Sequence, residues 1–152
     1  VVYARGGRLV GAAAPLVGDG GVLLDETTLS MWDGRLVANC RIQGFEGRGS
    51  GARYLAWGDG RTWEGGRLWK LDDPGCNARM IGALFVHPGR VDARACGEIV
   101  RLTPPWEGEV RAEVVASFGD DTFGYSDATV DGDEAVVVFE RDRGLWEVEA
   151  RF

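Results

Sequence analysis

Hydrophobic and polar residues alternate along most of this chain with the two-residue period of a β-strand. The clearest example is segment 35–45, in which Leu36, Ala38, Cys40 and Ile42 face one way and Arg35, Asn39, Arg41 and Gln43 face the other. This alternation is typical of a sheet that buries one face and leaves the other in water. No segment has the spacing of an amphipathic helix, so the pattern predicts an all-β protein.

Turn sequences separate the alternating runs at intervals of roughly 8–12 residues, which is the spacing of strands in sandwiches and barrels. Asp33-Gly34 is the strongest hairpin signal, and Gly6-Gly7 and Asp131-Gly132-Asp133 also predict tight turns. We therefore expect a single domain over residues 1–152, folded as an antiparallel β-sandwich of the jelly-roll type. An up-and-down β-barrel and a β-trefoil are the alternatives.

Three of the six tryptophans lie within residues 53–70, around a predicted turn at Gly58–Gly60. Aromatic side chains beside a turn either fill a core or form a flat platform for a ligand. Trp57, Trp63 and Trp69 are six residues apart and therefore have equal parity on a regular strand, but the interruption at Glu64-Gly65-Gly66 makes parity an unsafe guide beyond it. Trp69 is assigned to the core, and for the other two both explanations stay open.

The platform explanation places a ligand site on this aromatic hairpin and on the neighbouring glycine-rich loop. No catalytic motif stands out in the chain, so we expect a non-catalytic module that binds carbohydrate or a protein partner. The arginines and the aspartate would bind polar groups of the ligand while the rings stack against it. The expected ligand-binding residues are Tyr54, Trp57, Trp63, Arg53, Asp59, Arg61 and Arg48.

Two other tryptophans and the single histidine have structural interpretations. Trp32 and Trp146 lie at strand positions that predict burial in the core. His87 precedes Pro88, which predicts a turn residue. One histidine cannot supply a histidine-based metal site, and no nucleophile motif surrounds it.

Composition excludes several classes of partner. The net charge of -7 argues against binding to nucleic acid or to an anionic membrane, since both need a basic surface. No apolar run approaches the ~18 residues of a membrane span. The chain begins at Val1 rather than at methionine, which favours a processed or secreted product. Its oligomeric state has no signature in the sequence.

The three cysteines, Cys40, Cys76 and Cys96, cannot all pair within one chain, and their spacing matches no zinc motif. Three reduced thiols are favoured over one disulfide and one free thiol. Cys40 falls on the apolar face of its strand, where a thiol behaves as a small hydrophobic group.

An acidic cluster near the end of the chain is a candidate calcium site. Hard oxygen ligands on a loop suit calcium. The cluster does not fit an EF-hand loop, and a solvated turn is the alternative explanation. The candidate ligands are Asp127, Asp131, Asp133 and Glu134.

The segment Gly89–Ile99 reads GRVDARACGEI and resembles the third motif of the dUTPase family. In this resemblance Asp92 matches the catalytic aspartate, whereas Ala95 stands where the family has a tyrosine that stacks on the nucleotide. The resemblance covers eleven of the 152 residues. It implies an alternative function, magnesium-dependent hydrolysis of a nucleotide.

A second short segment, Gly51–Ala56 followed by Asp59-Gly60, resembles one repeat of β-trefoil proteins. Three such repeats make a trefoil, and the other two copies do not align in this chain. A third possible function needs no motif, because any sheet with an exposed edge strand can pair with a strand of another protein.

Overall fold

The computed structural model describes residues 2–5, 8–12, 16, 18, 22–43 and 51–152. This part of the chain forms strands and no helix, which confirms the predicted all-β class and leaves no helix that could span a membrane. The strands are β1 (Val2–Arg5), β2 (Arg8–Ala12), β3 (Leu23–Trp32), β4 (Arg35–Gln43), β5 (Ala52–Gly58), β6 (Trp63–Lys70), β7 (Arg79–Ile81), β8 (Leu84–Pro88), β9 (Gly97–Leu102), β10 (Ala112–Ser117), β11 (Ser126–Asp131), β12 (Glu134–Arg141) and β13 (Gly144–Arg151).

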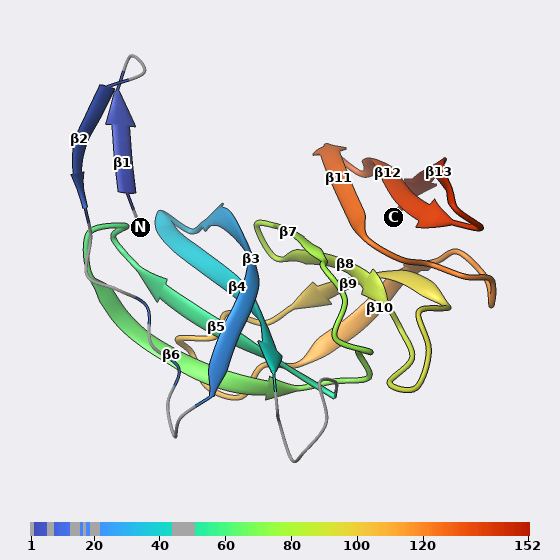
Figure 1. The fold of residues 1–152 in the computed structure, drawn as a ribbon, viewed down its shortest axis with the longest axis horizontal. Helices are drawn as coiled ribbons and strands as arrows, with labels where there is room; N and C mark the ends of the chain where they lie inside the picture. The colour runs from blue at the N-terminus through green and yellow to red at the C-terminus, as the bar shows by residue number, and fades with distance from the viewer. Residues whose placement is uncertain (1, 6–7, 13–15, 17, 19–21, 44–50) are drawn as a thin grey trace.

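The strands form one two-stranded hairpin and three larger antiparallel sheets, none of which closes into a barrel. The first sheet has the order β3-β4-β5-β6, the second β10-β9-β8-β7 and the third β11-β12-β13. In Figure 1 the three follow one another from the lower left to the upper right, and the β1–β2 hairpin projects at the upper left. Neighbours in each sheet are also neighbours in sequence, whereas a jelly roll needs Greek-key connections. The jelly-roll prediction is therefore not confirmed.

The β3–β4 hairpin has the predicted turn. Trp32 pairs with Arg35, so the loop consists of Asp33 and Gly34 alone. Both loop residues have positive φ angles, 48° and 76°, as a type I′ turn requires. Asp and Gly tolerate this conformation better than most residues, which explains why this dipeptide predicts the hairpin.

The central strand β4 is buried on both faces, so the expectation of one wet face is wrong there. Val37 and Asn39 are fully buried on one face, and Ala38 and Cys40 are fully buried on the other. The second sheet covers the first face, and partly buried side chains that include Leu24 cover the opposite one. All three cysteines are free thiols, and Cys40 lies in the core as predicted.

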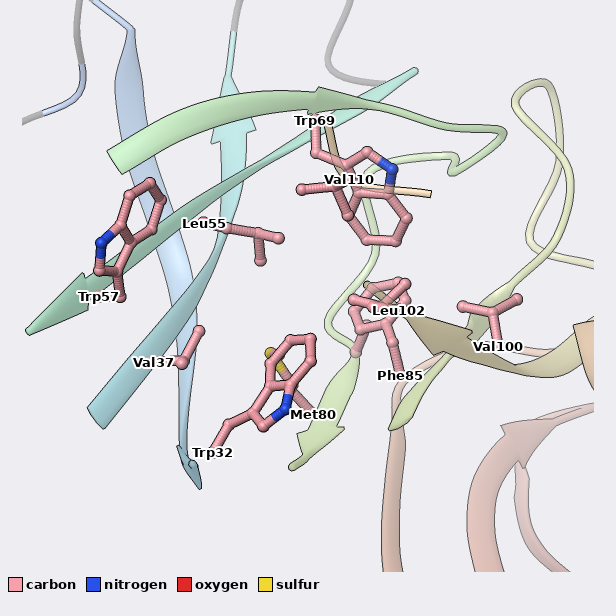
Figure 2. Packing of buried hydrophobic residues seen from close by; sticks show 11 residues of the cluster. Trp32, Val37, Leu55, Trp57, Trp69, Met80, Phe85, Val100, Leu102 and Val110 are labelled. Carbon is pink, nitrogen blue, oxygen red and sulfur yellow. The ribbon is translucent and has the colours of Figure 1, made fainter. Parts of the chain in front are cut away.

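The first and second sheets share a core rich in aromatic residues, which supports a sandwich-like arrangement. Figure 2 shows Trp57 and Trp69 of the first sheet in one buried cluster with Phe85 and Met80 of the second. Trp69 meets Phe85 edge-on, with ring centroids 5.4 Å apart. Trp106 closes one end of this core, because its ring lies 5.2 Å from that of Trp32.

A separate core joins the second sheet to the third. Phe123, in the loop before β11, stacks on Phe139 of β12 with 4.4 Å between ring centroids. Val86 and Ile99 of the second sheet and Val137 of the third are buried around them. The third sheet is thus anchored through its inner face.

A one-residue bulge places Trp63 on the opposite face of the sheet from the other two tryptophans of the aromatic hairpin. Trp57 pairs with Gly65 and Gly58 pairs with Trp63, so Glu64 is the extra residue. A bulge reverses the faces of the residues beyond it. Trp63 therefore packs against the core that contains Cys40, and the expected equal parity of the three indoles is wrong.

Two glycines after the bulge make room for aromatic rings on opposite faces of β6. A Cβ atom on Gly65 would lie 2.5 Å from Cζ2 of Trp57, and one on Gly66 would lie 2.4 Å from the hydroxyl of Tyr54. The rings of Trp57 and Tyr54 therefore pack directly against the backbone of Gly65 and Gly66. The Gly-Gly pair is therefore a packing requirement of the hairpin.

Replacement of Gly65 by alanine should destabilise the protein by about 1–3 kcal/mol, because the new methyl group overlaps the buried indole of Trp57. Urea denaturation measures this change. Gly144→Ala is the matched control, since its Cβ would approach nothing closer than 3.6 Å. Equal stabilities of the two variants would contradict the packing role of Gly65.

Candidate functional site

The residues predicted for the aromatic-hairpin site do not share one surface. Tyr54 and Trp57 are only 3% and 9% exposed and lie in different cores on opposite faces of β5. Arg53 is fully buried and Trp63 is partly buried. Asp59 and Arg61 are exposed at the turn, and Arg48 lies outside the described residues.

Asp59 has a local structural role in this turn. Its Oδ1 atom accepts hydrogen bonds from the backbone N–H groups of Arg61 and Thr62, both at 2.7 Å. These bonds to the backbone lower the pKa of the Asp59 carboxyl below its ordinary value. The carboxylate is thus engaged within its own loop.

Arg53 occupies the space between the first and second sheets. Its Nε atom donates to Oδ1 of Asn39 at 3.1 Å, and its Nη1 atom donates to the carbonyl of Cys76 at 2.6 Å. The same Nη1 atom lies 3.5 Å from Oδ1 of the fully buried Asp73. A buried guanidinium needs such partners, so Arg53 is part of the internal structure rather than of a ligand surface.

The single histidine belongs to the same buried network, which corrects its interpretation as a turn residue. His87 lies within β8 and is 1% exposed. Its Nδ1 atom is 3.4 Å from Oδ2 of Asp73, and its Nε2 atom is 3.2 Å from Oε1 of Glu98. The side chain of Glu98 is 21% exposed and connects the network to solvent. His87 lies two residues after the apolar Phe85 and therefore on the same face of the strand. This spacing was the available signal for an inward position.

Protonation of His87 is favoured by this setting. Burial alone lowers the pKa of the imidazole, but the flanking carboxylates of Asp73 and Glu98 outweigh it and raise the pKa above its ordinary value. Burial likewise opposes ionisation of Asp73, but His87 and Arg53 lower the pKa of that carboxyl. The result is a buried, charge-balanced ion cluster that joins two sheets.

The four predicted calcium ligands do not form one site. Asp127 and Asp131 are four residues apart on β11, which separates them by about 13 Å along the strand. Asp127 lies 3.3 Å from Arg79, whereas Asp133 and Glu134 lie near Arg151. Among the described residues, no three side chains of His, Cys, Asp or Glu come together as a metal site.

Asp92, the residue that matches the dUTPase catalytic aspartate, is exposed and held by a neighbour. Arg90 donates to both of its carboxylate oxygens, at 2.9 and 2.8 Å. This bidentate pair lowers the pKa of the Asp92 carboxyl. The geometry supplies a local reason for the aspartate that does not involve a nucleotide.

The strongest candidate for a binding surface is the outer edge of β13. This strand pairs only with β12 in the described part of the chain. Glu140 of β12 exchanges backbone hydrogen bonds with Gly124 and Tyr125, on the side away from β13. Its partner Leu145, and by alternation Glu147 and Glu149, therefore direct their N–H and C=O groups away from β12.

An open groove of about 450 Å³ runs beside this edge. One bank is β10, the terminal strand of the second sheet, with Ala116 and the following Phe118. The other bank is the inner face of the β12–β13 hairpin, where Trp146, Val148 and Ala150 alternate. A row of free backbone groups thus lies next to apolar side chains.

Trp146 is 47% exposed at one end of the groove, so its predicted burial in the core is wrong. Its predicted side is right, because it pairs with the buried Phe139. The groove separates it from β10, however, and leaves the ring uncovered. Its Nε1 atom donates to the carbonyl of Arg141 at 3.1 Å, and the Arg141 guanidinium lies 4.7 Å from the ring. Tryptophan and arginine are common anchors of protein interfaces.

The raised pKa of His87 makes part of the stability pH-dependent. A folded-state pKa above the unfolded value means that this contribution is complete below about pH 6.5 and is lost as pH rises through the folded pKa. We expect the stability advantage of the wild type over His87→Gln, measured by urea denaturation, to shrink as pH rises above 6.5. An advantage that grows with pH would show instead that the histidine is buried in its neutral form.

The chain matches no protein-family model and no curated protein. Neither the dUTPase resemblance nor the β-trefoil resemblance therefore gains support from a family model or a curated protein. The function is argued from the geometry of the β13 edge.

Proposed function

We propose that the protein is a non-catalytic binding domain that holds an extended segment of a protein partner by adding it as a strand to β13. The observation that carries the proposal is the outer edge of β13, along which no described residue pairs. The backbone groups of Leu145, Glu147 and Glu149 point outward beside an apolar groove. This is the interaction through a strand edge that the sequence left open as a third possibility.

The spacing of these groups suits a polypeptide. Outward-facing residues on a strand repeat every two residues, or about 6.8 Å, and an added strand presents its own N–H and C=O groups at the same interval. Backbone hydrogen bonds then supply affinity, and the pockets for alternate side chains supply specificity. The groove beside Trp146 and Val148 would receive the side chains of one face of the added strand.

A protein ligand fits this surface better than a carbohydrate. A sugar ring needs an open aromatic face, and of the three rings expected for that purpose Tyr54 and Trp57 are buried and Trp63 is partly buried. Trp146 is exposed, but the Arg141 guanidinium lies over its ring and its Nε1–H is already engaged. Hydrogen-bonding groups in a row along a strand match a backbone rather than a hexose.

The arrangement of ionisable residues also supports binding rather than catalysis. His87 has a carboxylate beside each of its ring nitrogens, inside the protein. Asp92 is held in a bidentate pair with Arg90. The dUTPase-like alternative predicts magnesium-dependent hydrolysis that Asp92→Asn abolishes.

Glu147→Pro is the sharpest test of strand addition. The Glu147 N–H points away from β12, so proline removes a donor from the edge without breaking the β12–β13 ladder. Peptides selected from a random phage-displayed library on the wild type should bind this variant at least about tenfold more weakly, since one backbone hydrogen bond of about 1 kcal/mol is lost and the ring obstructs the added strand.

Glu147→Gln is the matched control, because both variants lack the carboxylate and only Glu147→Pro also lacks the N–H; Glu147→Gln should therefore bind the peptides more tightly than Glu147→Pro does. The melting temperature of Glu147→Pro should stay close to that of the wild type, which separates loss of the edge from unfolding. Peptides that bind Glu147→Pro as tightly as the wild type would refute strand addition at β13.

A further inference from the structure

We propose that the strand held by β13 alternates cationic and apolar residues. This inference rests on the proposed function and names the partner of that site by its chemistry. One face of the added strand would meet carboxylates of the third sheet, and the other face would enter the groove.

The outer face of the third sheet is strongly acidic. Strand alternation and register place the side chains of this face together, opposite the buried Val137 and Phe139. The acidic members are Asp127, Asp131, Glu134, Glu140, Glu147 and Glu149, and the basic member is Arg151.

Part of this charge is already compensated, and part is not. Arg151 lies 3.1 Å from Asp133 and 3.9 Å from Glu134, and Arg79 lies 3.3 Å from Asp127. The carboxylates nearest the free edge, Glu147 and Glu149, make no ion pair with any described residue. The edge of β13 therefore presents two uncompensated negative charges next to its free backbone groups.

The register of an added strand converts these charges into a sequence preference. Residues placed opposite Glu147 and Glu149 share their face of the sheet, and the residue between them faces the groove beside Val148. Opposite charges in directly opposed cross-strand positions are favourable, and like charges are unfavourable. The expected core of the ligand is therefore Lys or Arg, then an apolar residue, then Lys or Arg.

The same charges disfavour a second copy of this chain as the occupant. Antiparallel pairing of two β13 strands about Val148 would place Glu147 opposite Glu149 of the other copy. Both pairs would bring like charges together. The net charge of -7 on each copy adds to the repulsion. A cationic segment of another protein meets neither obstacle.

Three end-blocked nine-residue peptides test the inference, alternating valine with lysine, with serine or with glutamate. Isothermal titration at 0.15 M salt should give at least tenfold tighter binding for the lysine peptide than for the serine peptide, and the weakest binding for the glutamate peptide. The double variant Glu147→Lys and Glu149→Lys should reverse the order. Glu107→Lys with Glu109→Lys is the matched control, since both are exposed acids with the same change in net charge, and it should keep the wild-type order.

Other outcomes separate this inference from the proposed function. Equal binding of the three peptides, all weakened by Glu147→Pro, would overturn the cationic preference and leave strand addition standing. A further peptide carries the same lysines and valines in two separate blocks. If it binds as well as the alternating peptide, the attraction is electrostatic and does not depend on strand register, which would overturn the proposed alternation. Failure of all three peptides, together with a random library that yields no ligand sensitive to Glu147→Pro, would overturn both proposals.

Discussion

The buried contact of Arg53 with Asp73 holds the two largest sheets together. Arg53 comes from β5, Asp73 from the link between the first and second sheets, and His87 from β8. Asp73 also fixes the link itself, because its carbonyl accepts from the Gly51 N–H and its Oδ1 atom accepts from the Gly75 N–H, both at 2.7 Å. Removal of one member of such a buried pair leaves an unpaired charge in the core, at a cost of about 3–5 kcal/mol. The aromatic core shown in Figure 2 lies beside this cluster and depends on the same approach of the two sheets.

The third sheet joins this framework through its core with the second sheet, and the hydroxyl of Tyr125, just before β11, also donates to Oε1 of Glu26 in β3 at 2.6 Å. Phe123 and Phe139 pack against Val86 and Ile99 on its inner face, and Asp127 on its outer face lies 3.3 Å from Arg79 of β7. The strand farthest from β11 is β13, whose outer edge pairs with no other strand of the described chain. Free edges invite aggregation, and charged side chains along them are a common protection. Glu147 and Glu149 would serve both purposes, since they repel another copy of the chain and attract a cationic strand.

Strand alternation and turn chemistry predicted the all-β class, the β3–β4 hairpin and the buried positions of Trp69 and Cys40. These features depend on local conformation, which residues such as Asp33-Gly34 determine directly. The side that Trp146 occupies was also predictable, but its exposure was not, because parity does not tell whether another sheet covers that side. The bulge at Glu64 placed Trp63 on the opposite face; Gly65 and Gly66 signal an irregular strand there, but they do not tell which tryptophan changes face. His87 was missed because its carboxylate partners are distant in sequence.

Amide hydrogen exchange followed by NMR tests strand addition to the backbone of β13 most directly. In the free protein, the N–H groups of Glu147 and Glu149 should exchange quickly and those of Trp146 and Val148 slowly, because only the latter bond to β12. Saturation with the alternating lysine–valine peptide should slow exchange at Glu147 and Glu149 and leave the other two nearly unchanged. Binding of that peptide without new protection at Glu147 and Glu149 would contradict strand addition at this edge.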